Sequence, residues 1–400
     1  MTYLNNAAFS HPKPEEVYAD MDAAARRWVA YPGSRIAAGK DDARDLMEDT
    51  RRQAASLFGV SEPGRVIFTL NGTDALNIAL KGFLKDGDHV LTTSVEPSAI
   101  SRPLTHLQMK GRISLTRIEV REDGCIDPGR LERAIRHRTR LVAISHACSA
   151  LGTVRSVEEI ARITRRKNAR LLVDAAHTAG VVPLAAEEWG IDLLAMSGHK
   201  GLLGPAGTGL LVVGPEVSLA PCREGWTGGD PVLEVQPLDL PWALESGMPN
   251  LPGIAGLRAG LLFLKREGVE KIREHQTTLV KRFIGAIGLD DRFHLYAARG
   301  DVPRTGTVAF SLRGFPPAEL AAILARHYDI HVGAGLHGCP GAHRALKSFP
   351  EGTVRISLGC FNTEAEVDRT VAGLREIADS GLEQARELAS RTPSEVREAL

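Results

Sequence analysis

Two short stretches decide the fold of this chain, LLVDAAH at residues 171–177 and LLAMSGHKG at residues 193–201. Each begins with an apolar run that suits a buried strand, and polar residues follow. Asp174 ends the first strand, and Lys200 comes just after the second, 26 residues further on. We expect the two side chains to lie side by side at the carboxyl edge of a parallel sheet, where α/β folds bind their ligands.

The same alternation of strands and helices extends outward from this stretch. Further apolar runs occur at 66–69, 88–92, 141–145 and 210–213. Helical periodicity follows the first run at 73–85 and the second at 97–110. Continuous apolar runs are typical of strands covered on both faces by crossover helices, so the sequence predicts an α/β fold with a largely parallel sheet.

The C-terminal part has a different organisation. Residues 215–252 contain Pro, Gly and Trp with little periodicity and read as a long surface loop. Beyond the loop we expect helices at 254–267, 269–287, 364–380 and 382–390, and strands at 307–311 and 354–358. Single cores stop growing near roughly 250–300 residues, so a chain of 400 residues predicts two domains. We place the large domain at 1–250 and a smaller α+β domain at 251–400, on which the N-terminal segment can pack.

Composition narrows the class of protein. Hydrophobic residues make up 43% of the chain, which is enough for a sizeable core. The 49 Lys and Arg balance the 49 Asp and Glu, so no net positive field attracts nucleic acid or an anionic membrane. The five cysteines form no CxxC pair, which argues against a disulfide framework or a thiolate metal site. These features indicate a cytoplasmic protein that acts on a small molecule.

A third motif points to a phosphate group. Asn71-Gly72-Thr73 follows the run at 66–69 and opens the helix predicted at 73–85. Exposed amides at a helix N-terminus, with a hydroxyl in the first turn, form a natural phosphate cup, although many simple helix caps look the same. Together with Asp174 and Lys200, this cup suits pyridoxal phosphate, because a lysine amine forms the Schiff base and a carboxylate keeps the pyridine nitrogen protonated. Taken singly, Asp174 could only cap a helix and SGHKG could be an ordinary turn.

In the order of these motifs the chain resembles class V aminotransferase-type enzymes of pyridoxal-phosphate fold type I, and within them the cysteine desulfurase-like group. The resemblance runs nearly from end to end. It is carried by Tyr3–Ala8, His11–Pro14, Asn71–Asn77, Val173–Gly180, Ser197–Gly209, Gly247–Asn250, Gly335–His337, Arg355–Leu358 and Phe361–Thr363. It implies a large domain with a mainly parallel sheet of the seven-stranded type, a smaller C-terminal domain, and a homodimer.

The resemblance also implies roles for individual residues. Lys200 falls on the position of the Schiff-base lysine, Asp174 on that of the partner of the pyridine nitrogen, and His177 on that of a residue that binds the ring hydroxyl. Arg355 lies where the family binds the substrate carboxylate, a task that suits the planar fork of arginine. The phosphate is expected to be held by Gly72, Thr73, Ser197 and His199.

Several positions depart from the family pattern. The desulfurase relatives carry a nucleophilic cysteine directly after Gly-Leu-His, whereas this chain has Gly338 there and Cys339 one residue later. Pro97 replaces a histidine that stacks on the cofactor ring and moves protons. Ser149 replaces an asparagine that helps to hold the substrate; Gly333 and Met248 replace an arginine and a threonine. These changes indicate a substrate pocket that differs from that of the relatives, while Asp174 and Lys200, which are expected to hold the cofactor, are retained.

Three functions therefore stay open at this point. The first is cleavage of the C–S bond of a cysteine-like amino acid by β-elimination, which needs no protein thiol. The second is a persulfide-forming desulfurase in which Cys339 is the nucleophile and an acceptor protein takes the sulfur. The third is an aminotransferase of a specialised pathway. A cofactor-binding scaffold without activity is disfavoured by Lys200 and Arg355, and a metal site at His337, Cys339 and His343 lacks an evident fourth ligand.

Overall fold

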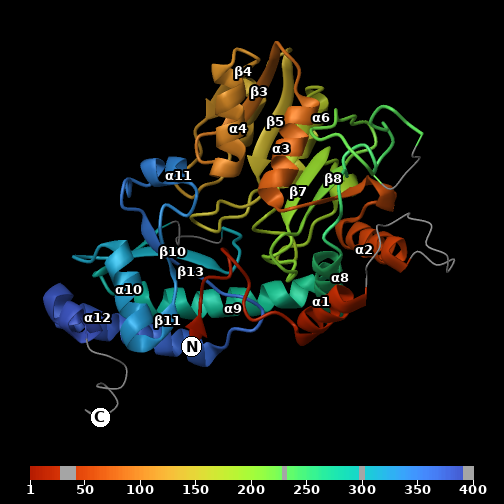
Figure 1. The fold of residues 1–400 in the computed structure, drawn as a ribbon. Helices are drawn as coiled ribbons and strands as arrows, with labels where there is room; N and C mark the ends of the chain where they lie inside the picture. The colour runs from red at the N-terminus through yellow and green to blue at the C-terminus, as the bar shows by residue number, and fades with distance from the viewer. Residues whose placement is uncertain (28–41, 228–231, 297–301, 391–400) are drawn as a thin grey trace.

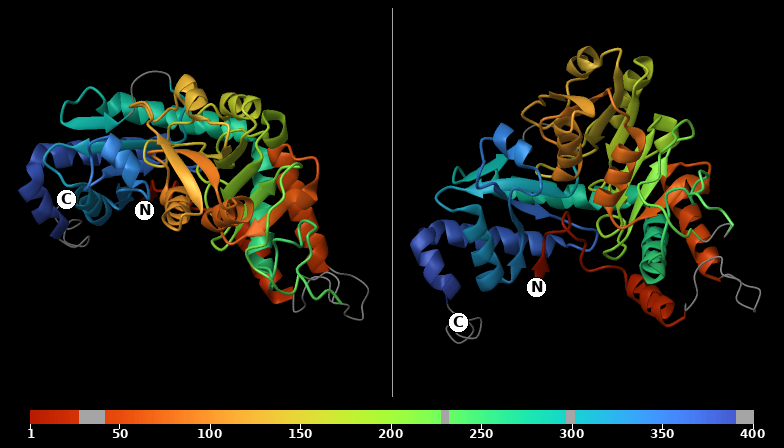
Figure 2. Two further views of the ribbon diagram at one scale, coloured as in Figure 1. Left: turned by 90° about the horizontal axis from the view of Figure 1, so that it is seen from above. Right: turned by 45° about the horizontal axis from the view of Figure 1, so that its top comes forward.

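The computed structural model describes residues 1–27, 42–227, 232–296 and 302–390. Figure 1 shows a large sheet with helices on both faces, and a smaller C-terminal sheet beside it. Helices α8 (Leu251–Glu267) and α9 (Val269–Ile287) run beneath both sheets (Figure 1). The views in Figure 2 show the C-terminal elements to one side of the large sheet.

Within the described residues, seven strands form the large sheet in the order β2-β8-β7-β6-β5-β3-β4. All neighbouring pairs are parallel except those that involve β8. The strands are β2 (Val66–Thr69), β3 (Asp88–Thr93), β4 (Ile113–Ile118), β5 (Thr139–Ser145), β6 (Arg170–Asp174), β7 (Leu193–Ser197) and β8 (Gly209–Val213).

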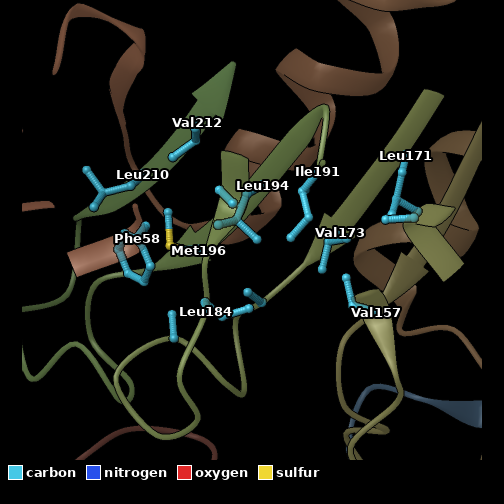
Figure 3. Close-up of a cluster of buried hydrophobic side chains, with 14 of the residues drawn as sticks. Phe58, Val157, Leu171, Val173, Leu184, Ile191, Leu194, Met196, Leu210 and Val212 are labelled. Atoms are coloured by element: carbon cyan, nitrogen blue, oxygen red, sulfur yellow. The ribbon is translucent and has the colours of Figure 1, made fainter. Parts of the chain in front are cut away.

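Both faces of this sheet are buried, as the continuous apolar runs predict. In β6, Leu171 and Val173 pack into the cluster on one face, whereas Leu172 packs into the cluster on the other. Figure 3 shows the first cluster, in which Val173 lies near Val157 and Ile191. Burial on both faces leaves only the strand ends open to solvent or ligand, so polar residues gather there.

Helices on the two faces supply the rest of these cores. Buried residues of α3 (Gly72–Phe83) and α4 (Ser98–Met109) pack on one face. Buried residues of α2, α5, α6 and α8 pack on the other. The remaining bounds in this part are α1 (Glu15–Arg27), α2 (Asp42–Phe58), η1 (Pro63–Arg65), α5 (Pro128–Ala134), α6 (Val157–Arg166) and α7 (Ala186–Trp189).

The C-terminal part builds an antiparallel sheet in the order β12-β13-β10-β9. Strand β1 (Thr2–Tyr3) reaches across from the N-terminus and pairs with β11 in parallel. Gly381, at φ 74°, marks a kink within α12, so the two predicted helices meet without a loop. The bounds are β9 (Phe293–Tyr296), β10 (Thr307–Leu312), α10 (Pro317–Tyr328), β11 (Ile330–His331), β12 (Gly333–Gly335), α11 (Pro340–Ala345), β13 (Thr353–Ser357) and α12 (Glu364–Ser390).

The predicted α/β fold with a mainly parallel seven-stranded sheet and a smaller α+β part is confirmed. Periodicity alone did not indicate that β8 runs against its neighbours. The domain boundary at residue 250 stays a prediction. Leu257, Leu261 and Leu264 of α8, which lies just beyond that boundary, belong to the core of the large sheet, whereas most buried residues of α9 belong to the core of the C-terminal sheet.

Candidate active site

The candidate site lies where β6 and β7 end side by side. Asp174, the last residue of β6, pairs in register with Ala195 of β7, and Lys200 follows β7 by three residues. The Nζ atom of Lys200 lies 3.1 Å from Nε2 of His177, which follows β6. The sheet thus brings Asp174, His177 and Lys200 together at its carboxyl edge, as the spacing predicts.

Asp174 is buried, and few hydrogen bonds compensate its carboxylate for the loss of water. Its carboxylate accepts a hydrogen bond from the backbone N–H of Ala176 at 2.9 Å. Burial raises the pKa of Asp174 to about 6, and this backbone hydrogen bond and the charge of Lys200 oppose the rise. A cation that offered an N–H to this carboxylate would lower its pKa again.

Burial makes the neutral amine of Lys200 easier to reach than that of an exposed lysine. Burial lowers its pKa to about 8, while the nearby Asp174 carboxylate opposes the shift. Burial and the charge of Lys200 lower the pKa of His177 well below its ordinary value, so the imidazole is neutral. A neutral imidazole can accept a hydrogen bond from the lysine. The result is an amine that can act as a nucleophile or as a base near neutral pH.

The start of α3 faces the end of β7. The backbone N–H of Gly72 donates to Oγ of Ser197 at 3.1 Å, and Asn71 caps the helix by accepting from the N–H of Asp74 at 3.0 Å. A Cβ atom at residue 72 would lie 2.7 Å from Oγ of Ser197, so a larger residue there would displace this hydroxyl. Thr73 is exposed beside it. Gly72, Thr73 and Ser197 thus lie together at the helix N-terminus.

His199, the fourth residue assigned to the phosphate, lies under the N-terminal segment. Its ring stacks on Phe9 with 6.0 Å between centroids, and burial lowers its pKa to about 4. Its buried Nδ1 atom has no hydrogen-bond partner among the described residues. Nδ1 of His199 is therefore available to bind a group that the described residues do not supply.

Arg355, in the middle of β13, is buried without a counter-ion. Its Nη1 donates to the backbone carbonyl of Ser149 at 2.8 Å, and its Nη2 donates to Oδ1 of Asn5 at 3.3 Å. Its Nε atom has no partner, and none of the described carboxylates pairs with it. Burial lowers the pKa of Arg355 to about 10. A guanidinium that is desolvated and only partly satisfied is suited to bind a carboxylate.

Ser149 therefore lies beside Arg355 and contacts it through its backbone carbonyl, while its role in holding the substrate stays a prediction. Cys339 lies elsewhere. Its thiol is 0% exposed, donates to the carbonyl of Val95 at 2.9 Å and lies in the apolar cluster that includes Cys148. Gly338, the residue before it, is exposed. The one-residue shift seen in the sequence thus turns the thiol into an apolar cluster and away from the residues around Lys200.

A small cavity reaches Lys200 and His177 between the two sheets. Its volume is about 50 Å³, and its other lining residues include Asn6, Gln276 and Ser357. Arg355 does not line it. This space is large enough for water beside the lysine but not for an amino acid.

Two contributions to the site were missed in the sequence. Asn5 binds Arg355, and Lys13 donates from Nζ to the carbonyl of Ser10 at 3.0 Å and to that of His199 at 3.4 Å. Both lie in the N-terminal motif, whose polar residues were the available signal. A third feature, the ion pair between Arg155 and Glu96 at 2.7 Å, is fully buried. No local pattern distinguishes such a pair from surface charges.

The comparisons with known proteins agree with this geometry. A family model described as Aminotransferase class-V matches residues 2–370. The chain belongs to this family. A probable cysteine desulfurase of Pyrococcus abyssi is 32% identical over 94% of both chains, and one of Methanothermobacter thermautotrophicus is 31% identical over 84% of both. The apo structure of a cysteine desulfurase from Thermococcus onnurineus has a TM-score of 0.87 at 30% identity and covers 95% of each chain.

Pyridoxal 5'-phosphate is the cofactor of this family, and fold type I is its fold, so both expectations are confirmed. The residues present fit the cofactor. Asp174 is a buried carboxylate that needs a cationic partner, Lys200 is a half-buried amine of lowered pKa, and a Cβ atom at residue 72 would press on the Ser197 hydroxyl. In the described part of the chain no three metal-ligating side chains gather, and no helix has the length and apolar character to cross a bilayer.

Proposed function

We propose that this enzyme cleaves the C–S bond of a cysteine-like amino acid by β-elimination, and that no protein thiol attacks the sulfur. The observation that carries the proposal is the position of Cys339. Its thiol is buried and donates to the Val95 carbonyl, whereas Gly338, the residue before it, is exposed. A thiolate that attacks a substrate sulfur must reach it, whereas elimination needs only a base and an electron sink.

The cofactor would be held by Lys200, by Asp174 and by the N-terminus of α3. Asp174 would bind the ring nitrogen and Lys200 would carry the cofactor covalently. His177 would bind the ring hydroxyl, and Gly72, Thr73, Ser197 and His199 would bind the phosphate. When bound, the cofactor supplies an electron sink that stabilises negative charge at the substrate α-carbon. The lowered pKa of Lys200 supports the role of this lysine as the covalent anchor.

Lys200 is also the base that the proposal requires. Its Nζ atom, with a pKa near 8, can take the α-proton and pass a proton to the departing sulfur. His177 is neutral and lies 3.1 Å away, so it can accept a hydrogen bond that keeps the amine in place. Pro97 cannot move a proton, which leaves the proton transfers to Lys200.

Arg355 would bind the substrate carboxylate through its unpaired guanidinium face. The Ser149 carbonyl and Asn5 hold the guanidinium on its other side, so these two residues position the clamp. Because both are neutral, the charge of Arg355 stays available to a substrate anion.

A second candidate is a persulfide-forming desulfurase. The relatives named cysteine desulfurase favour it, and so do the positive φ angles of Gly335 and Gly338, which give the loop before Cys339 a conformation that few other residues adopt. In that case an acceptor protein would take the sulfur. The distinguishing experiment measures the products: pyruvate with free sulfide supports elimination, and alanine with protein-bound persulfide supports the desulfurase. An aminotransferase would convert the cofactor to its amine form when an amino donor is added alone.

We further propose a cytoplasmic homodimer. The Gly247–Asn250 loop presents Met248, which is 58% exposed, beside Leu70, which is 53% exposed; both line one surface groove. Exposed apolar side chains next to the helix cup suit a second copy of the chain. Sedimentation of the cofactor-loaded protein tests this proposal, and an active monomer would contradict it.

A further inference from the structure

Exposed cations gather at the amino edge of the large sheet, opposite the edge that carries Lys200. Strands β4, β3, β5 and β6 are parallel neighbours, so their first residues lie at one edge. The segments that lead into these strands are basic. Their exposed side chains, which we call the basic edge, are Lys85 before β3, Lys110 and Arg112 before β4, Arg136 and Arg138 before β5, and Arg165, Arg166 and Lys167 before β6.

Direct contacts join these segments into one surface. The backbone N–H of Gly87, just before β3, donates to the carbonyl of Arg112 at 2.8 Å. The Nη2 atom of Arg138 donates to the carbonyl of Gly87 at 3.2 Å. On the other side of β5, Nη2 of Arg166 lies 3.2 Å from Oε1 of Glu132 in α5. The cations therefore belong to a single surface and not to four separate loops.

Most of the basic edge lacks a counter-ion. Arg112 pairs with Asp86 and Arg166 with Glu132, whereas the other members form no ion pair among the described residues. Exposed arginines elsewhere in the described chain are often paired, as Arg282 is with Asp368. The whole chain has 49 residues of each charge. The excess of positive charge at this edge is therefore local.

Helix ends explain only part of this accumulation. Basic residues complement the partial negative charge of a helix C-terminus, and Arg165 and Arg166 lie in the last turn of α6. Lys85, Arg136 and Arg138 lie outside the helices, so this reason does not apply to them. The positive potential there also acts on a neighbour. Burial lowers the pKa of His89, at the start of β3, and the charges of Arg136 and Arg138 act in the same direction.

We propose that the basic edge is a docking surface for an acidic segment of a partner protein. Neighbouring strands lie about 4.8 Å apart, so the starts of four strands span about 15 Å. An extended segment advances about 3.3 Å per residue, so about five residues cross this surface. Asp and Glu side chains of such a segment match the guanidinium groups, which bind carboxylates through two parallel hydrogen bonds.

Nucleic acid suits this surface less well. Asp86 and Asp88 lie among the cations at the start of β3, and their charges repel a continuous phosphate backbone. The segments that lead into the four strands carry no Phe, Tyr or Trp on which an unpaired base could stack. A protein segment can place its carboxylates between the two acids, whereas a phosphate backbone has fixed charge spacing.

The docking surface is separate from the candidate active site. Strand β6 runs from Arg170 to Asp174, and five residues of strand are about 16 Å long. A segment bound at the amino edge therefore does not reach Lys200 at the carboxyl edge. The partner would hold the enzyme in place without receiving a group from it, so the proposal is independent of whether the enzyme is a lyase or a desulfurase.

The test measures binding of fluorescein-labelled poly-L-glutamate to the cofactor-loaded full chain by fluorescence anisotropy at about 0.15 M salt. Saturable binding is expected. Arg136→Gln/Arg138→Gln should weaken it about tenfold, as expected for the loss of two exposed charge pairs. Arg26→Gln/Arg282→Gln is the matched control, because it removes two exposed arginines far from the basic edge and should leave the affinity unchanged.

A second variant, Lys85→Gln/Lys110→Gln, removes two other charges of the basic edge and should also weaken binding. All the substituted side chains are exposed, so far-ultraviolet circular dichroism and cofactor absorbance should stay as in the wild type. The proposal is wrong if poly-L-glutamate does not bind at this salt concentration, or if both edge variants bind it as tightly as the control does. Tighter binding of a labelled RNA duplex of equal charge would also overturn it.

Discussion

The Nζ atom of Lys200 lies 3.1 Å from Nε2 of His177, and the two residues follow the neighbouring strands β7 and β6. Both side chains are desolvated, so the imidazole is neutral and the amine has a pKa near 8. The pair sits above the buried carboxylate of Asp174 at the same sheet edge. This arrangement supports the proposal that Lys200 is both the cofactor anchor and the base.

Borohydride should fix the cofactor on Lys200 alone. Lys13 is a matched control, because it is also buried with a pKa lowered to about 8, yet its Nζ is held by Ser10. Peptide mapping after reduction should find the cofactor on Lys200 in the wild-type protein and in Lys13→Ala, and no linked cofactor in Lys200→Ala. A reduced link that persists in Lys200→Ala would show that the anchor is another lysine.

Asp174→Asn should stabilise the cofactor-free protein while it weakens cofactor binding. Burial raises the pKa of Asp174 from 3.8 to about 6, so the folded state prefers the protonated acid. Its contribution to stability is complete below about pH 4 and is lost as the pH rises through about 6. Asp174→Asn has no charge to bury, so it keeps this free energy of unfolding, which is worth roughly 1–3 kcal/mol.

Thermal unfolding of the two apoproteins on either side of pH 6 checks this prediction. The Asp174→Asn apoprotein should be more stable than the wild-type apoprotein above that pH, and the difference should shrink below it. A variant that is less stable than the wild-type apoprotein at every pH would indicate that the carboxylate is satisfied by the chain itself.

Arg355→Ala should lower kcat/KM by about ten- to a hundredfold, because a charge-assisted bond to the substrate carboxylate is worth roughly 1.5–3 kcal/mol. Arg355→Lys keeps the charge but loses the fork and should recover only part of the loss. Arg282→Ala, which removes an exposed arginine paired with Asp368, is the control and should leave kcat/KM unchanged. Steady-state kinetics distinguish the three variants.

Cys339→Ala should retain most of the turnover and lose about 1 kcal/mol of stability, since it removes a small buried group. The control is Cys222→Ala at an exposed position. If Cys339→Ala binds substrate normally and releases no sulfur, the thiol takes part in the reaction and the persulfide route replaces elimination.

Much of the cofactor site could be predicted from the sequence, because its residues lie at fixed offsets from strand ends. Asp174 and Lys200 follow apolar runs, and Gly72 opens a helix directly after β2. The direction of the Cys339 thiol could not be predicted, since it depends on how α11 docks on Val95. The cluster that holds Cys148 and Cys339 and the Arg155–Glu96 pair likewise join segments far apart in the chain, and periodicity carries no information about them.

The most direct test of the proposed elimination is the product of L-cysteine turnover by the wild-type enzyme without added reductant. Elimination predicts pyruvate, ammonia and free sulfide in equal amounts, with no alanine and no persulfide on the protein. Alanine as the main organic product, with sulfur recovered as a persulfide on Cys339, would contradict the account.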